Sequence, residues 1–248
     1  MVKSNRRIAV VVARLALACA LWVSCCALLT STAWAGDLED GFAAAQKGDF
    51  VTALKLLQPL AERGDSNAQY NLGVMYQYGD GVTQDYKAAV KWYTAAAEQG
   101  FPEAQNNLGV MYQNGDGVTQ DYKTAVKWYT AAAEQGFAKA QYNLGVMYDN
   151  GKGVAQDYKT AVKWYTAAAE QDFAEAQYRL GLMYFKGTGV IQNFVKAHAW
   201  FNIAASSGNS EHAAENRDKI AQKMTPAQIA QAQELATRCM ASNYKDCD

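Results

Sequence analysis

The sequence predicts an all-α protein, built as a stacked array of antiparallel helix pairs. The first observation is a strict 36-residue spacing of tryptophan, shared by Trp92, Trp128, Trp164 and Trp200. A fixed period of roughly 20 to 50 residues is typical of stacked repeats. The second observation is that apolar residues recur at helical spacing twice in each copy, with glycine-containing loops between the two stretches.

Four segments align without gaps and define the array. They are residues 68–103, 104–139, 140–175 and 176–211. Residues 36–67 keep part of the pattern, for example Gly48-Asp49-Phe50, and we interpret them as a degenerate N-terminal repeat. The pattern ends after the fourth copy, so residues 212–248 are predicted to form a C-terminal helical cap and tail.

The first helix of each copy is predicted from one apolar stripe. In the copy 68–103 the stripe consists of Ala68, Leu72, Met75 and Tyr76, at positions i, i+4, i+7 and i+8. The helix should end at Gly79, because glycine readily adopts the left-handed conformation of a C-terminal cap.

The second helix should begin after Asp85, whose carboxylate suits an N-cap. Its apolar stripe consists of Tyr86, Ala89, Val90, Tyr93 and Ala97, and Gly100 closes the copy. Bulky aromatic side chains must fill the space between copies, and we expect Tyr76, Trp92 and Tyr93 to do so. We therefore interpret the periodic tryptophans first as residues that pack at the contact between helices and between copies, which we call the joint.

One more helix is predicted in the tail, from Pro226 to about Met240. Thr225 can act as its N-cap, proline suits the first helical position, and Gln228 can complete a capping box. We expect this helix to cover the open end of the stack, because a repeat array needs a terminal element with a polar outer face.

Residues 1–35 have the pattern of a secretory signal peptide. Four basic residues and no acidic ones are followed by an apolar run from Leu15 to Leu29, and Ala33-Trp34-Ala35 supplies a cleavage site. We expect cleavage after Ala35 and a periplasmic or secreted protein without a membrane span. A retained signal anchor and lipidation at Cys19 stay open as alternatives.

The composition excludes several classes of protein. A chain that is 50% hydrophobic and 19% charged, with a formal net charge of −1, is not intrinsically disordered. Without residues 1–35 it keeps 19 basic and 24 acidic residues, so we expect no nucleic-acid partner.

Two cysteines remain after residue 35, Cys239 and Cys247, and an exported protein favours a disulfide between them. A continuous helix would hold them too far apart, so the chain should turn back near Asn243. Two free thiols are the alternative.

Candidate catalytic residues are few. His198 and His212 are the only histidines, and we interpret His198 as a partly exposed structural residue. No cluster has the spacing of a metal site, and no phosphate or dinucleotide motif is present, so no metal or cofactor is expected. Ser242 and Lys245 match the short Ser-x-x-Lys pattern of penicillin-interacting enzymes.

The copy 68–103 resembles the Sel1-like repeat (SLR) family, a relative of the tetratricopeptide repeat. The residues that carry the resemblance are Leu72-Gly73, Tyr76, Gly79-x-Gly81-Val82, Asp85, Ala89, Trp92-Tyr93 and Ala96. The resemblance covers residues 37–211 and implies a right-handed α-solenoid that works as a non-enzymatic protein-interaction scaffold. Asp172 departs from the pattern, because it stands where earlier copies have Gly100 and Gly136.

Two alternative functions stay open. Some cysteine-rich relatives in the family are described as β-lactamases, so one alternative is a β-lactamase-like or peptidoglycan-acting enzyme. Those relatives carry a cysteine pair in each repeat, and no repeat here does. The other alternative is a glycan-binding module that uses the four periodic tryptophans.

The candidate binding surface is predicted from the positions that vary between near-identical copies. Variable positions of the first helix lie opposite its core stripe, and we expect them to line a concave groove. The predicted groove residues are Tyr70, Val74, Gln77, Tyr78, Asn106, Asn114, Tyr142, Asn150, Tyr178 and Lys186. Tyrosine and asparagine suit recognition of a peptide or protein, so the expected partner is a protein or peptide of the cell envelope, bound by a monomer.

Overall fold

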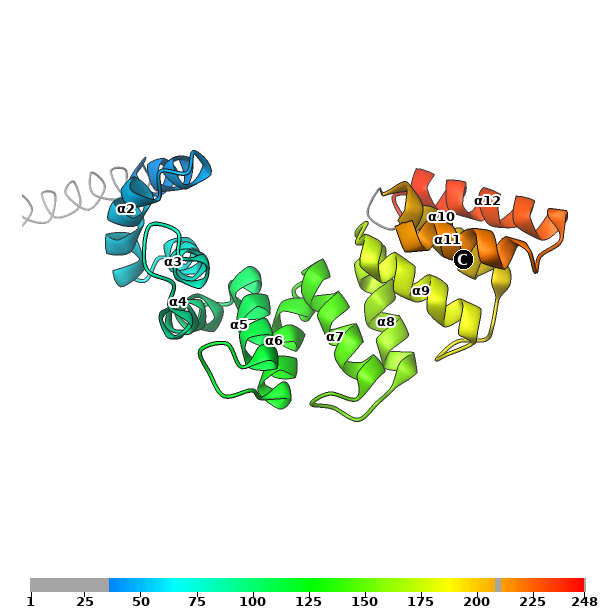
Figure 1. Cartoon of the computed structure of the whole chain (residues 1–248), viewed down its shortest axis with the longest axis horizontal. Helices are drawn as coiled ribbons and strands as arrows, with labels where there is room; N and C mark the ends of the chain where they lie inside the picture. The colour runs from blue at the N-terminus through cyan, green and yellow to red at the C-terminus, as the bar shows by residue number, and fades with distance from the viewer. Residues whose placement is uncertain (1–35, 208–210, 248) are drawn as a thin grey trace, which may run out of the picture. The chain divides into compact units, whose positions relative to one another are not determined.

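A computed structural model describes residues 36–207 and 211–247, and throughout these ranges the regular structure is helical (Figure 1). The predicted signal segment, residues 1–35, lies outside the described residues. The chain divides into two compact units, the N-terminal unit (residues 1–84) and the C-terminal unit (residues 85–248). The all-α prediction is confirmed, and the helix pairs form an α-solenoid.

The N-terminal unit contains a helix over residues 36–46, followed by α2 (Phe50–Glu62) and α3 (Ser66–Tyr78). Asp49 caps α2 by accepting a hydrogen bond from the backbone N–H of Thr52 at 3.1 Å. Helix α2 packs against α3, and the two contribute Leu57 and Leu72, both fully buried, to the core. Residues 36–67 therefore contribute a helix and the following α2 to the packed array.

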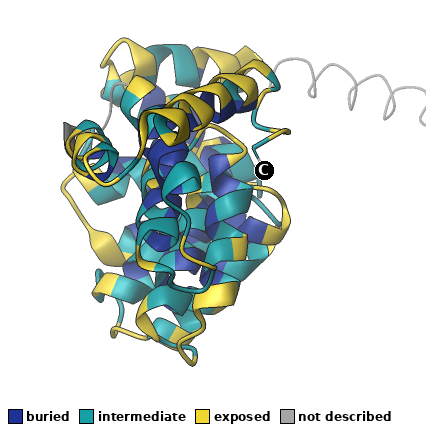
Figure 2. Cartoon of the chain, turned by 90° about the vertical axis from the view of Figure 1, so that its right-hand side faces the viewer, coloured by how far each residue is buried: buried dark blue, intermediate teal, exposed yellow. Residues whose placement is uncertain are grey.

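The C-terminal unit contains the remaining helices. They are α4 (Tyr86–Glu98), α5 (Pro102–Asn114), α6 (Tyr122–Glu134), α7 (Ala138–Asn150), α8 (Tyr158–Ala169), α9 (Ala174–Lys186), α10 (Phe194–Ser206), α11 (Glu211–Ala221) and α12 (Pro226–Ala241). From α4 to α11, each helix packs against the next along the chain. Exposed residues predominate on the outer sides of these helices and buried residues lie between them (Figure 2).

Local side-chain chemistry sets the helix ends. The Asp85 carboxylate accepts hydrogen bonds from the backbone N–H groups of Lys87 and Ala88 at 2.9 and 3.1 Å, which confirms the predicted N-cap of α4. Asp121 and Asp157 repeat this arrangement at α6 and α8. At the other end, Gly79 caps α3 in the left-handed conformation with φ 79°, as predicted.

Tyrosine, rather than tryptophan, fills the joints of the C-terminal unit. Tyr129 and Tyr165 are fully buried, and each ring lies against a helical glycine of the same copy, Gly109 and Gly145. A Cβ atom built on either glycine would lie 2.7 Å from the ring, so only glycine leaves room for it. The first and second helices of a copy pack closely for this reason.

The periodic tryptophans lie beside this joint and are less buried than expected. Trp128 and Trp164 are only half-buried, and the Lys127 and Lys163 ammonium groups lie 5.6 and 5.5 Å from the ring centroids of these tryptophans. Trp200 is the buried exception, with 4% of its surface exposed.

Helix α12 explains why Trp200 is buried. Leu235 and Cys239 of α12 share a core cluster with Trp200, and α12 packs on α10. The capping box that begins the helix forms as predicted, because Thr225 and Gln228 each accept a backbone hydrogen bond from the other. The tail helix therefore covers the last tryptophan of the array.

The chain turns back after α12 at Asn243, as predicted. Asn243 and Tyr244 have φ values of 52° and 61°. The turn joins Cys239 to Cys247, with a Cα–Cα distance of 4.5 Å, and the Arg238 guanidinium lies 3.0 Å from the Asp246 carboxylate. Covalent, ionic and backbone features therefore all hold the tail against α12.

Asp172 connects this tail to the array. Asp172 has a left-handed backbone with φ 61°, at the place where Gly100 and Gly136 stand in earlier copies. Its carboxylate accepts a hydrogen bond from the Tyr244 hydroxyl. The departure from the repeat pattern thus supplies the acceptor that holds the tail.

Candidate functional site

Four of the ten predicted groove residues are exposed. They are Tyr78, Asn114, Asn150 and Lys186, and each is the last residue of a first helix, immediately before its C-cap glycine. Tyr78, in the N-terminal unit, has 66% of its surface exposed. In the C-terminal unit we name Asn114, Asn150 and Lys186 the variable row, because this helix end is tyrosine in the first copy, asparagine in the next two and lysine in the fourth.

Asn106 is not available to a partner, so its assignment to the groove is wrong. It is 1% exposed, and its Oδ1 accepts a hydrogen bond from Asn143 of the following copy at 2.9 Å. Its Nδ2 donates to Asn107 at 3.3 Å. Asn106 therefore joins two first helices.

Tyr142 and Tyr178 are also joint residues, although both are half-buried and keep some accessible surface. The Tyr142 ring lies 5.8 Å from Tyr165 and 5.3 Å from Phe173, between centroids. The Tyr178 ring lies 5.7 Å from Phe201. Tyr70, Val74 and Gln77, the remaining predicted groove residues, are half-buried in the N-terminal unit.

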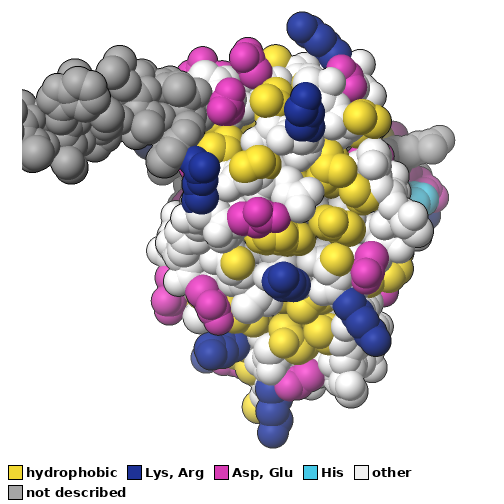
Figure 3. All heavy atoms as spheres, turned by 90° about the vertical axis from the view of Figure 1, so that its left-hand side faces the viewer, with side chains coloured by type: hydrophobic (Ala, Val, Ile, Leu, Met, Phe, Trp, Pro, Cys, Tyr) yellow, Lys and Arg dark blue, Asp and Glu magenta, His cyan; other side chains and the backbone are white. Residues whose placement is uncertain are grey.

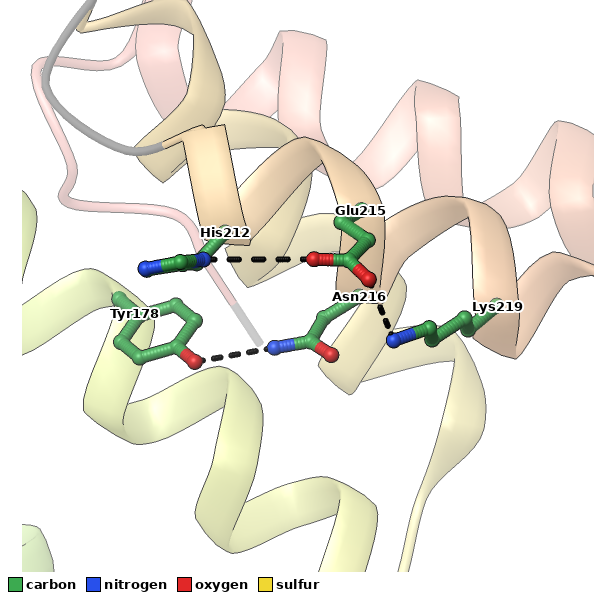
Figure 4. A network of polar contacts seen from close by, with 5 residues as sticks. All are labelled: Tyr178, His212, Glu215, Asn216 and Lys219. Carbon is green, nitrogen blue, oxygen red and sulfur yellow. Dashed lines mark hydrogen bonds and ion pairs between the residues drawn. The ribbon is translucent and has the colours of Figure 1, made fainter.

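Helix α11 lies over the fourth copy and contacts one predicted groove residue directly. Asn216 Nδ2 of α11 donates a hydrogen bond to the Tyr178 hydroxyl of α9 at 3.0 Å (Figure 4). On α11 itself, the Glu215 carboxylate lies 2.6 Å from the Lys219 ammonium and 4.0 Å from His212 Nδ1. The hydrogen bond from Lys219 lowers the pKa of Glu215. Of these contacts, the hydrogen bond between Asn216 and Tyr178 is the one that joins α11 to α9.

A pocket of about 340 Å³ opens between α9, α10 and α11. Its apolar lining residues are Leu182, Phe185, Phe201 and Ile220, and its polar ones are Lys186, Asn216, Lys219, Gln222 and Lys223. The lining includes one member of the variable row, Lys186.

Sequence reasoning missed this pocket, although one signal for it was present. Leu182 and Phe185 are the fourth-copy counterparts of Val74 and Gln77. Phenylalanine at a position that is Gln77, Gln113 or Asp149 in earlier copies indicates an apolar contact unique to this copy.

A model of the Sel1 repeat matches five consecutive segments of the chain. They are residues 36–65, 66–101, 102–137, 138–173 and 174–209. The chain belongs to the Sel1 repeat family. Sel1 repeat proteins generally act as protein-interaction scaffolds.

Two solved structures are similar to this Sel1 repeat protein. A protective antigen present in uropathogenic Escherichia coli strains, which displays an SLR fold, is 37% identical with a TM-score of 0.74. That match covers 85% of this chain and 45% of the antigen, so the chain spans less than half the antigen's length. A Sel1 repeat protein from Oxalobacter formigenes is 30% identical with a TM-score of 0.65, over 85% of this chain and 79% of the other. A search of curated proteins gave no match.

Ser242, the one serine singled out by motif, is used structurally in this Sel1 repeat protein. Its hydroxyl donates to the Cys239 carbonyl at 2.8 Å and accepts from the Asp246 backbone N–H at 3.0 Å. An activated nucleophile instead donates to a neighbouring base. The hydroxyl therefore stabilises the turn that closes the tail.

The Sel1 repeat array also offers little for metal binding, membrane crossing or sugar stacking. In the ranges that the structure describes, no group of three or more His, Cys, Asp or Glu side chains could hold a metal ion. No helix within the same ranges is both long and apolar enough to cross a membrane.

Lys91, Lys127 and Lys163 lie over the half-buried tryptophans that follow them, so these rings are not bare stacking platforms for a sugar.

His198 is buried, with 3% of its surface exposed, so the expectation of a partly exposed residue is wrong. Among the described residues its Nδ1 has no hydrogen-bond partner. Burial, followed by the nearby Arg217 charge, lowers the pKa of His198 below its ordinary value.

His198 should therefore make folding sensitive to acid. The unfolded chain binds a proton at His198 as the pH falls through about 6.5, whereas the folded chain does not, so the free energy of unfolding falls. We expect a slope of up to roughly 1.4 kcal/mol per pH unit below that pH, measured from urea unfolding. His198→Gln should flatten this slope. A slope that stays unchanged in His198→Gln would contradict the assignment.

Proposed function

We propose that the chain is an exported, non-enzymatic scaffold that binds a protein of the cell envelope through its first-helix ends. One observation carries the proposal. Copies that share nearly every joint residue carry Tyr78, Asn114, Asn150 and Lys186 in turn at the exposed helix end, so the first and fourth copies depart from the asparagine of the middle two. If this surface only had to be solvated, the exposed helix-end residue would have no reason to change while the packing residues stay the same from copy to copy.

The chemistry of the row suits a polypeptide ligand. Asparagine offers both donors and an acceptor, and the two asparagines are held only by short local bonds. Asn114 Nδ2 donates to the Asp116 carboxylate at 3.1 Å, and Asn150 Nδ2 donates to the Val146 carbonyl at 2.9 Å. Such exposed bonds can be exchanged for bonds to a partner's backbone at small cost.

Photo-crosslinking in the native envelope tests this proposal. A photoreactive amino acid is introduced at Asn114 or Asn150, and as matched controls at Lys123 or Lys159, exposed residues of the second helices. We expect both row positions to capture the same protein, identified by mass spectrometry, and the control positions not to capture it. Equal capture from the row positions and the control positions would place the binding surface elsewhere. No capture from the row positions would refute the scaffold role.

Export is the second part of the proposal. It is supported by the signal-type pattern of residues 1–35, by the cysteine pair that the structure joins, and by similarity to a protective antigen. N-terminal sequencing of the protein recovered from the periplasm should begin at Gly36. A chain that keeps its first residues in the cytoplasm would contradict export.

The cysteine pair gives a separate prediction. Protein denatured in iodoacetamide without reductant should show no alkylation of Cys239 or Cys247 by mass spectrometry. Cys247→Ser should lower the free energy of unfolding by about 2–3 kcal/mol, because a crosslink over this short loop no longer restricts the unfolded chain. Tyr244→Phe, which removes the hydroxyl that donates to Asp172, should cost about 1 kcal/mol. Two free thiols in exported protein would refute the pairing.

A further inference from the structure

We infer that the pocket between α9, α10 and α11 receives an apolar side chain from an acidic segment of the partner protein. This inference rests on the proposed function, because it names the chemistry that the scaffold recognises at one end of its variable row. In the two preceding copies the counterparts of Leu182, Val110 and Val146, pack against core clusters that include residues of the next first helix.

The floor of the pocket is apolar. Phe201 and Ile220 are each 1% exposed and form its base, while Leu182 and Phe185 are half-buried and line its wall. The Phe185 ring lies 5.9 Å from the Phe194 ring, so it is fixed by packing from behind. A volume of about 340 Å³ is at the small end of ligand pockets, roughly 300–1,000 Å³, and suits one large side chain.

The rim of the pocket is basic. Lys186, Lys219 and Lys223 are all exposed, and none of the described residues that line the pocket carries a carboxylate. Lys223 lies over the Phe185 ring at 5.5 Å, which places its charge at the mouth. Lys219 contacts Glu215 at 2.6 Å, but an ammonium group has three donors, so this contact leaves donors for a ligand.

This concentration of positive charge is local. The whole chain has a formal net charge of −1, and on the face in Figure 3 basic and acidic side chains are interspersed. Three lysines around an apolar cavity therefore favour a ligand that combines a hydrophobic group with flanking negative charges.

The variable row favours a polypeptide over a lipid as that ligand. Lys186 is both a rim residue and the row member of the fourth copy, and Asn150 and Asn114 occupy the same helix end in the two preceding copies. A partner segment anchored in the pocket can continue along these asparagines with its backbone amides hydrogen-bonded. An acyl chain has no group that would use them.

A random-peptide display library, panned against the full chain, tests the inference directly. We expect enrichment of peptides with one aromatic or long aliphatic residue flanked by Asp or Glu. The strongest of these peptides, labelled with a fluorophore, then gives a dissociation constant by fluorescence anisotropy.

Two variants probe the rim and the cavity separately. Lys186→Gln with Lys219→Gln and Lys223→Gln removes the charge, and Gln222→Trp places an indole at the exposed edge of the pocket. Each variant should raise the dissociation constant of the selected peptide at least tenfold. Matched controls are Lys87→Gln with Lys123→Gln and Lys159→Gln, and Gln233→Trp, all at exposed positions outside the pocket lining. They should change the affinity less than twofold.

Three results would overturn the inference. They are no peptide enrichment, enrichment of peptides without acidic residues, and unchanged affinity in both pocket variants. In the first of these cases, binding of dodecanoate would assign the pocket to an anionic lipid. If Asn114 and Asn150 still capture one partner while these variants have no effect, the scaffold function stands and only the pocket assignment falls.

Discussion

Replacing Tyr129 by alanine is expected to lower the free energy of unfolding by about 3–5 kcal/mol, whereas replacing its neighbour Trp128 should cost roughly 1 kcal/mol. Tryptophan is the larger side chain and the more regular feature of the sequence, so size alone predicts the reverse order. Tyr129 is fully buried against Gly109, however, and its removal leaves a cavity. Trp128 is half-buried, so its loss removes less apolar contact.

Urea unfolding followed by circular dichroism measures both effects. Tyr129→Phe is the matched control, because it keeps the ring and removes only the hydroxyl that donates to Gln113 at 3.0 Å. It should cost about 1 kcal/mol. If Trp128→Ala destabilises the protein more than Tyr129→Ala, tryptophan is the main joint residue after all.

The helix ends could be predicted from sequence because their causes are local. The Asp85 carboxylate reaches backbone N–H groups two and three residues away, and Thr225 and Gln228 bond to each other across three residues. Gly79 needs only its own backbone freedom to cap α3. Neither kind of signal depends on how the helices later pack.

The joints could be predicted only in part, because their residues meet across copies. Tyr129 and Trp128 are adjacent on one helix, and a turn of about 100° per residue decides which of them points into the joint. The apolar stripe that contains Tyr93 indicated that the tyrosine faces inward, but the period of 36 residues led us to expect the tryptophan in the joint as well.

The candidate surface was the least predictable feature. Variation between copies selected Asn114 and Asn150, which are exposed, but it also selected Asn106, which is buried. Asn106 accepts a hydrogen bond from Asn143 of the next copy, so this variable residue belongs to the packing between copies. The pocket was missed because one of its walls is α11, which lies after the last recognisable copy.

Gly153→Ala is expected to destabilise the C-terminal unit by about 2–5 kcal/mol. Gly153 has φ 75°, and a Cβ atom there would lie 2.5 Å from the Tyr122 carbonyl carbon, at the start of the preceding copy's second helix. The substitution therefore combines backbone strain with a clash against backbone that cannot rotate away. The loop around Gly153 should therefore pack less closely against the start of α6.

Gly136→Ala is the matched control. Gly136 has φ 87°, but among the described residues no atom lies within 4 Å of a Cβ atom built there, so only the strain of a left-handed alanine remains, about 1–2 kcal/mol. Gly136→Asp should cost no more, because the next copy already places Asp172 at this position with φ 61°. The urea midpoints of the three variants give the order of their stabilities. Equal losses for Gly153→Ala and Gly136→Ala would mean that conformation alone explains the loop glycines, and that close packing between copies does not depend on Gly153.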